Sequence, residues 1–304
     1  MAARAWRSIL ALALAASALG AALLARSFSW SLPTSLGAAL LLLTAIPVAA
    51  TLASFLVALT VSGRMHALRG VRIGRTLFGE MAAFSLAILA MVADAPDRRP
   101  AQARPAGGIA RPVLLLHGFL CNHRVWRLLQ ARLDAAGYGP VEAVDVEPLL
   151  ADIDAQASRV APRLLALQQE CSGARVVIIA HSMGGLVARA LLRQLGTRAI
   201  RRIVTIASPH HGTALAFGWP WTDTRQMSRR SMWLNALNSA QEGRLGVPVT
   251  SIYSLEDNLV VPAESARLQG AELHELRGVG HLAMLRSRCV LDRVLSTLSG
   301  EWAV

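Results

Sequence analysis

The sequence contains no lysine, and all 31 of its basic residues are arginine. The formal net charge of +12 would suit a nucleic-acid partner, but no basic run interleaved with aromatic residues is present. Residues 1–93 hold seven arginines and one glutamate, a net charge of +6, and the other +6 is spread over 211 residues. We therefore expect no nucleic-acid binding, and the charge fits proximity to a membrane better.

Cysteine is also scarce, with Cys121, Cys171 and Cys289 far apart and without CxxC spacing. This pattern gives no metal framework and no redox motif, and the odd count leaves at least one free thiol. The three side chains are expected to be small buried hydrophobes. Neither a metal nor a cofactor is implied.

Charged residues make up only 16% of the chain, and the mean hydropathy is +0.43. That value is too apolar for an ordinary soluble enzyme, and the excess lies in the first 93 residues. We predict a membrane region of two to three helices over 1–93. A linker rich in proline, alanine and arginine follows over 94–110, and a catalytic domain over 111–304.

Two uncharged runs in the N-terminal region are candidate membrane helices. The run over 9–25 follows two arginines and fits a signal peptide or a first transmembrane helix. Ser35–Val61 has 27 residues without a charge, more than the roughly 20 that cross a bilayer. Four arginines follow this run and one lies between the two, so the positive-inside rule places both ends of the hairpin in the cytoplasm.

A third apolar stretch, Leu77–Val92, has 16 residues and is interrupted by Glu80. It is short for a span, and an interfacial helix is the alternative. We favour a span, which places the following domain outside the cytoplasm. An interfacial helix would leave that domain inside.

From Arg111 onward, short β-branched and leucine-rich runs alternate with helix-like stretches. This alternation predicts a parallel sheet with helices on both faces. The expected strands are 113–116, 141–146, 175–180, 202–207, 249–254 and 272–276. The expected helices are 124–136, 155–170, 184–195 and 282–298.

Three reactive residues follow strands of this sheet: Ser182 the third, Asp257 the fifth and His281 the sixth. Sites in parallel sheets form at the carboxyl ends of strands, and nucleophile, acid, histidine is the chain order of an α/β-hydrolase triad. Ser182 lies in IIAHSMGG, which matches the elbow motif G-x-S-x-G except that Ala180 replaces the first glycine. We expect Ser182 to be the nucleophile, His281 the base and Asp257 the acid that orients the imidazole.

The oxyanion donors are expected to be the backbone N–H groups of Met183, after the nucleophile, and of Phe119, in the HGF loop. The residues expected to support the site are His117, Gly118, His181, Gly184, His210 and His211. Glu256, Asp223 and Asp145 compete with Asp257 for the role of acid. The segment 214–245, rich in tryptophan and arginine, is either packing over the sheet or an aromatic flap beside the site.

The motifs HGF, AHSMGG, SPHHGT, VTSIYSLEDNLVVP and GVGHLAML together resemble the small bacterial triacylglycerol lipases and esterases. The resemblance covers roughly residues 111–298 and implies an α/β-hydrolase fold. It also implies the same roles for Ser182, Asp257, His281, Phe119 and Met183. The N-terminal region departs from it, because secreted lipases of this kind carry a cleaved signal instead of a membrane hairpin.

The expected function is hydrolysis of carboxylic esters, of lipids or small molecules, by a membrane-anchored serine hydrolase. Transfer of the acyl group to an alcohol or thiol is one alternative, and a catalytically inactive membrane scaffold is another. The expected location is the bacterial inner membrane, multi-pass. The catalytic domain would face the periplasm if the third stretch spans, and the cytoplasm if it does not.

Overall fold

The computed structural model describes residue 8 and residues 32–62, 71–92 and 110–299. The predicted helix over 9–25 and nearly all of the predicted linker lie outside these ranges.

Six parallel strands form one sheet in the order β2-β1-β3-β4-β5-β6. The predicted parallel sheet is therefore confirmed, and no predicted strand is missing. The strands are β1 Val113–Leu116, β2 Val141–Val144, β3 Val176–His181, β4 Ile200–Ile206, β5 Val249–Ser254 and β6 Glu272–Leu276.

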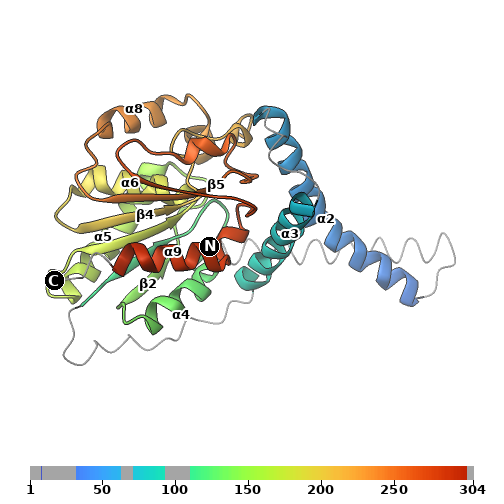
Figure 1. The fold of residues 1–304 in the computed structure, drawn as a ribbon, viewed down its shortest axis with the longest axis horizontal. Coiled ribbons are helices and arrows are strands. Elements are labelled where there is room, and N and C mark those ends of the chain that lie inside the picture. Colours follow the sequence, from blue (N-terminus) through green and yellow to red (C-terminus); the bar gives the residue numbers. More distant parts are fainter. Residues whose placement is uncertain (1–7, 9–31, 63–70, 93–109, 300–304) are drawn as a thin grey trace.

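Both faces of the sheet are covered by helices. In the view of Figure 1, α6 (Met183–Leu195) and α8 (Met232–Gln241) lie above the sheet, and α4 (Arg127–Ala135) and α9 (Arg288–Ser299) lie below it. α5 (Ile153–Glu170) packs with α6.

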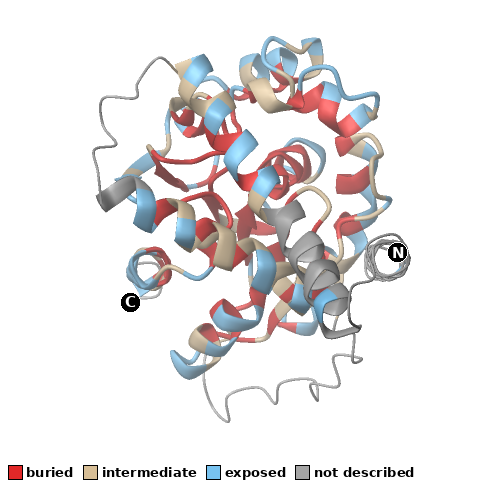
Figure 2. Cartoon of the chain, turned by 90° about the vertical axis from the view of Figure 1, so that its right-hand side faces the viewer, coloured by how far each residue is buried: buried red, intermediate tan, exposed pale blue. Residues whose placement is uncertain are grey.

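Neighbouring residues along β1 and β3 point to opposite faces. Leu114 and Ile178 belong to the core beneath α5 and α6, whereas Leu115 and Ile179 belong to the core shared with α4 and α9. β1 and β3 are buried along their whole length, in the central part of the molecule that is red in Figure 2. These continuous apolar runs are typical of a parallel sheet that is covered on both sides.

Two N-terminal helices lie beside this α/β domain, α2 (Leu32–Ser62) and α3 (Val71–Val92), on the right in Figure 1. α3 has 22 residues and begins before the predicted start at Leu77, because VRIGRT contains no proline and a single glycine is tolerated inside a helix. Within the described ranges, Gly74–Val92 is the stretch long and apolar enough to cross a membrane, judged by length and composition only.

Helix α3 has one face against the α/β domain. It contacts the short helices η2 (His123–Trp126) and η5 (Ala283–Leu285), which follow β1 and β6. Thr76, Glu80, Ala83 and Met91 are buried, so this contact runs along most of the helix. The opposite face is apolar but exposed, at Phe78, Leu86 and Leu89.

A long connection links β4 to β5 and includes η3 (Ala214–Ala216), α7 (Thr222–Met227) and α8. It corresponds to the predicted aromatic segment. Phe217 and Met232 are almost fully exposed, and the rings of Trp219 and Trp221 stack with centroids 5.1 Å apart. We call residues 214–245 the aromatic segment below.

Candidate active site

The stretch IIAHSMGG forms a sharp turn between β3 and α6. Ser182 has φ 55° and ψ −128°, a conformation that non-glycine residues rarely adopt. Its N–H donates to the carbonyl of Ile206 at 2.9 Å, which fixes the turn against β4. Ser182 is half-buried while the residues on either side are buried. The turn therefore presents the hydroxyl at the carboxyl end of the sheet.

The glycines after the serine are required by close approaches. A Cβ on Gly184 would lie 2.4 Å from the carbonyl oxygen of Leu116, and one on Gly185 would lie 2.1 Å from the Ser208 hydroxyl. Ala180, in contrast, lies in the buried strand β3 and pairs with residues of both neighbouring strands. Alanine is accommodated there, so the departure from G-x-S-x-G leaves the turn intact.

His281 and Asp257 form a buried pair beside the elbow. His281 Nδ1 lies 3.0 Å from both carboxylate oxygens of Asp257. Asp257 Oδ1 also accepts from the N–H groups of Leu259 and Val260 at 2.8 Å, which orients the carboxylate. With Nδ1 engaged, Nε2 is the imidazole nitrogen left for a proton transfer.

The electrostatics of this pair favour a protonated imidazole. Burial alone would lower the pKa of His281, but the charge and hydrogen bond of Asp257 and the charge of Glu80 raise it above its usual value. The imidazolium that forms when a base accepts a proton is therefore stabilised.

The three competing carboxylates lie elsewhere. Glu256 accepts from the N–H of Gly278 at 2.6 Å, and Asp223 is buried on α7 next to the N–H of Thr224. Asp145 accepts from the N–H and Nδ1 of His123; burial would raise its pKa, but these bonds lower it to about 2. Of the four carboxylates weighed from sequence, Asp257 is the one bonded to His281.

The HGF loop touches the elbow directly. A Cβ on Gly118 would lie 2.7 Å from the Cβ of Ser182, so only glycine fits. His117 Nε2 accepts from the N–H of Val146, and its Nδ1 donates to the carbonyl of Gly118, both at 2.9 Å. This pattern requires a neutral imidazole, and burial lowers the pKa of His117 accordingly. His117 thus braces the loop that carries Phe119.

His181 packs against His281. Its ring centroid is 4.6 Å from that of His281, and its Nε2 lies 3.3 Å from the carbonyl oxygen of His281. Burial, followed by the charge of His281, holds the pKa of His181 well below its usual value. A neutral His181 donates to the backbone of the base and supports it from the side of β3.

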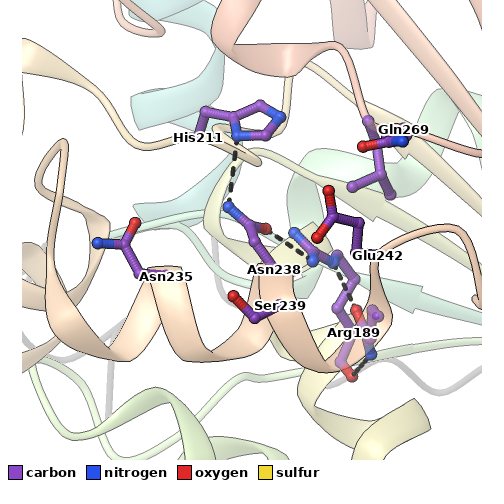
Figure 3. A pocket seen from close by; sticks show the side chains of 9 residues that line it. Arg189, His211, Asn235, Asn238, Ser239, Glu242 and Gln269 are labelled. Carbon is purple, nitrogen blue, oxygen red and sulfur yellow. Dashed lines mark hydrogen bonds between the residues drawn. The ribbon is translucent and has the colours of Figure 1, made fainter.

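The two histidines of SPHHGT lie away from the serine. His210 is buried and bonds Thr205 Oγ1 through Nε2 at 3.0 Å. His211 lines a pocket of about 290 Å³ beside Asn238 and Arg189 (Figure 3). We call it the second pocket, because it is separate from the cavity of Ser182 described below. There the buried Arg189 guanidinium donates to Asn238 and Gln241, which ties α6 to α8. His211 therefore lines a different pocket from Ser182.

A cavity of about 200 Å³ joins the candidate catalytic groups to helix α3. Ser182 and His281 lie in its wall, and so does Phe119. Helix α3 forms another part of that wall through Phe84, Ala87, Ile88 and Met91.

Sequence reasoning missed the contribution of the N-terminal helices. It treated Glu80 as an interruption of an apolar run, although Glu80 and the lining residues Phe84, Ile88 and Met91 recur at helical spacing. It also missed Asn258, whose Oδ1 accepts from the N–H of His281 at 3.0 Å. Asn258 was visible in sequence only as the residue after Asp257.

The parallel sheet and the strand–serine–helix turn at its carboxyl edge define the α/β-hydrolase fold, which confirms the resemblance at the level of fold. Residues 160–278 match the family described as the PGAP1-like alpha/beta domain. No curated protein sequence matches the chain significantly.

Two solved structures show the likeness. The mature form of the Bacillus licheniformis lipase BlEst2 has a TM-score of 0.57 and 16% identity, over 66% of this chain and 95% of that one. Aspergillus fumigatus lipase B has a TM-score of 0.56 and 19% identity, over 66% of this chain and 55% of that one. At these identities the likeness concerns the fold, and both alignments leave about a third of this chain uncovered.

Proposed function

We propose that this protein is a membrane-associated serine hydrolase that cleaves carboxylic esters, with lipid acyl esters as its substrates. The observation that carries the proposal is the meeting of three features at one apolar cavity: Ser182 on a strained turn, the His281–Asp257 pair and the HGF loop. The similarity of the fold to two lipases supports it.

In the proposed reaction Ser182 Oγ attacks the ester carbonyl carbon while His281 Nε2 accepts the hydroxyl proton. The N–H groups of Phe119 and Met183 donate to the oxyanion of the tetrahedral intermediate. The C–O bond then breaks, and His281 returns the proton to the leaving alcohol. A water molecule, deprotonated by His281, releases the acid and restores Ser182.

The cavity favours an apolar acyl group. Its described lining contains no arginine, aspartate or glutamate, and the side chains from α3 are aliphatic or aromatic apart from the Met91 thioether. An alkyl chain leaving water for this surface gains about 0.8 kcal/mol per methylene. A charged acyl group would lose its hydration without a partner.

Membrane association is supported by the outward faces of α2 and α3. They expose large apolar side chains that a water-soluble surface rarely gathers: Leu52, Leu56, Val61, Phe78, Leu86 and Leu89. α3 lies against the α/β domain from Thr76 to Met91, so a transmembrane α3 would draw the domain into the bilayer. We therefore propose that α3 lies in the membrane interface, with the catalytic domain on the cytoplasmic side.

Protease accessibility tests this orientation. We expect the catalytic domain to resist protease in intact spheroplasts and to be cleaved in inverted vesicles. Cleavage in intact spheroplasts would instead support the periplasmic location and a transmembrane α3.

Ser182→Ala tests the reaction. We expect loss of p-nitrophenyl ester hydrolysis by at least about a thousandfold, and loss of labelling by a fluorophosphonate probe, with the melting temperature preserved. Ser239→Ala, which changes a serine of the second pocket, is the matched control and should keep both signals. Parental turnover by Ser182→Ala would refute the assignment.

A further inference from the structure

Helix α3 brings a buried carboxylate to the loop that carries His281. Glu80 is 1% exposed. Its Oε1 accepts from the N–H of Leu282 and its Oε2 from the N–H of Ala283, both at 2.9 Å. These two amides directly follow His281. Burial raises the pKa of Glu80 above its usual value, although these two hydrogen bonds oppose the shift and favour the ionised carboxylate.

The loop is shaped to admit this side chain. A Cβ on Gly280 would lie 2.5 Å from Glu80 Oε2 and 2.8 Å from its carboxyl carbon. Residue 280 must therefore be glycine for the carboxylate to reach the amides on the other side of His281. Glu80 therefore contacts the residue before His281 and bonds the two residues after it. A non-specific contact between a helix and a loop would not require this arrangement.

Helix α2 makes a second link to the same region. Ser54 Oγ accepts from Asn258 Nδ2 at 2.8 Å, and Asn258 Oδ1 accepts from the N–H of His281. Three successive backbone N–H groups, of residues 281 to 283, are thus held by Asn258 and Glu80. An amide left unpaired in this buried loop would cost about 1–3 kcal/mol.

We propose that Glu80 is a positioning residue for His281 and that helix α3, which carries Glu80, contributes to the active site. This inference rests on the proposed function. Glu80 fixes the backbone that follows His281 and so fixes the position of the imidazole. Its charge also stabilises the imidazolium formed when His281 takes the proton of Ser182. The titratable groups that face this imidazole are Asp257, Glu80 and His181.

The test is Glu80→Gln in the full chain, with rates expressed per serine titrated by a fluorophosphonate probe. Glutamine keeps one acceptor and removes the charge. We expect kcat for a short p-nitrophenyl ester to fall about 10- to 100-fold with KM little changed, because the base is misplaced while the cavity remains. The acid limb of the pH profile of kcat/KM should move to lower pH, by about half a unit.

Two further variants complete the design. Glu80→Asp keeps the charge but is one methylene shorter, so the acid limb should stay near its parental position while kcat falls. Ser85→Ala removes an exposed hydroxyl that bonds only its own helix at Met81, and should leave both quantities unchanged.

The inference is overturned if Glu80→Gln keeps the parental kcat per labelled site and the parental acid limb, even when fewer molecules are folded. That result would give Glu80 a purely structural role. Failure of the proposed function is distinguishable, because then the parent protein itself would hydrolyse no ester and take up no probe at Ser182.

Discussion

Two parts of the chain contact the cavity of Ser182 in different ways: helix α3 forms part of its wall, whereas the aromatic segment contacts the lining residue Phe119. Helix α3 is tied to the loop of His281 through the buried carboxylate of Glu80, and to Asn122 through the carbonyl of Met91. The aromatic segment is hydrogen-bonded to the α/β domain through Gln226 and Gln241. At the cavity wall, however, it makes a ring contact, with the centroid of Trp221 6.2 Å from that of Phe119. Its Phe217 remains 86% exposed.

This difference determines how far each contacting segment can move relative to the cavity. Buried hydrogen bonds are directional, and breaking them leaves unpaired groups, so α3 is held in one position. Ring contacts tolerate changes of angle and distance at little cost. Helix α3 is thus a fixed wall of the cavity, whereas the ring of Trp221 can adjust its position against Phe119.

Gly280→Ala should have the largest effect, because it disrupts the contact between Glu80 and the loop of His281. The new methyl group overlaps Glu80 Oε2, so either the carboxylate or the loop of His281 must shift. We expect a loss of kcat of about 100-fold and a loss of stability of about 1–3 kcal/mol. Ester turnover and denaturant unfolding measure the two effects. Gly79→Ala, with nothing within 4 Å of the new methyl group, is the control and should keep activity.

The pH profile of the parent protein should show the charges around the base. A base must be neutral to accept a proton, so activity is lost as pH falls through the pKa of His281. Asp257 and Glu80 raise that pKa, which places the acid limb above the usual histidine value of about 6.5. Below the limb, kcat/KM should fall about tenfold per pH unit. A limb below pH 6 would contradict the assigned environment.

Ile88→Phe should narrow the cavity from the α3 side. Because this wall is fixed, the added volume cannot be relieved by movement of the helix. We expect kcat/KM for octanoyl and longer esters to fall about tenfold, with acetyl esters little affected, in a chain-length series. The control is Leu89→Phe, which enlarges an exposed neighbour outside this cavity. Equal losses for all chain lengths would argue against an acyl wall.

Trp221→Ala should have the smallest effect, because the ring contact of Trp221 with Phe119 can adjust. Loss of the ring contact with Phe119 removes about 0.5–1.5 kcal/mol, and we expect kcat/KM to fall about threefold. Trp219→Ala removes the half-exposed partner ring and should change hydrolysis of soluble esters less still. If Trp221→Ala impaired turnover as strongly as Gly280→Ala, the α3 contact and the Trp221 contact would not differ as described.

Much of the α/β domain could be predicted because its signals are local. The bounds of β1, β5 and β6 agree with the predicted strands, since short β-branched and leucine runs are bounded by turn residues. The pairing of His281 with Asp257 followed from chain order and from the carboxyl edge of a parallel sheet.

The role of helix α3 could not be predicted in the same way. Its sequence shows an apolar helix with one acid, but not the surface against which it packs. Glu80 and Leu282 are separated by 202 residues, and nothing local to either residue indicates the other. The same holds for Ser54 and Asn258. Contacts between two regions of the chain are the part of the site that sequence patterns leave undetermined.

The contact between Glu80 and Gly280 also determines whether the α/β domain can be separated from helix α3. Residues 110–299 contain the proposed triad and oxyanion donors, which suggests a domain that could be excised or fused to another membrane anchor. Such a fusion would strip the loop of His281 of two hydrogen-bond acceptors and open the acyl cavity to water. The helices before the linker are thus not an interchangeable tether, and a chimera would have to carry α3 with it.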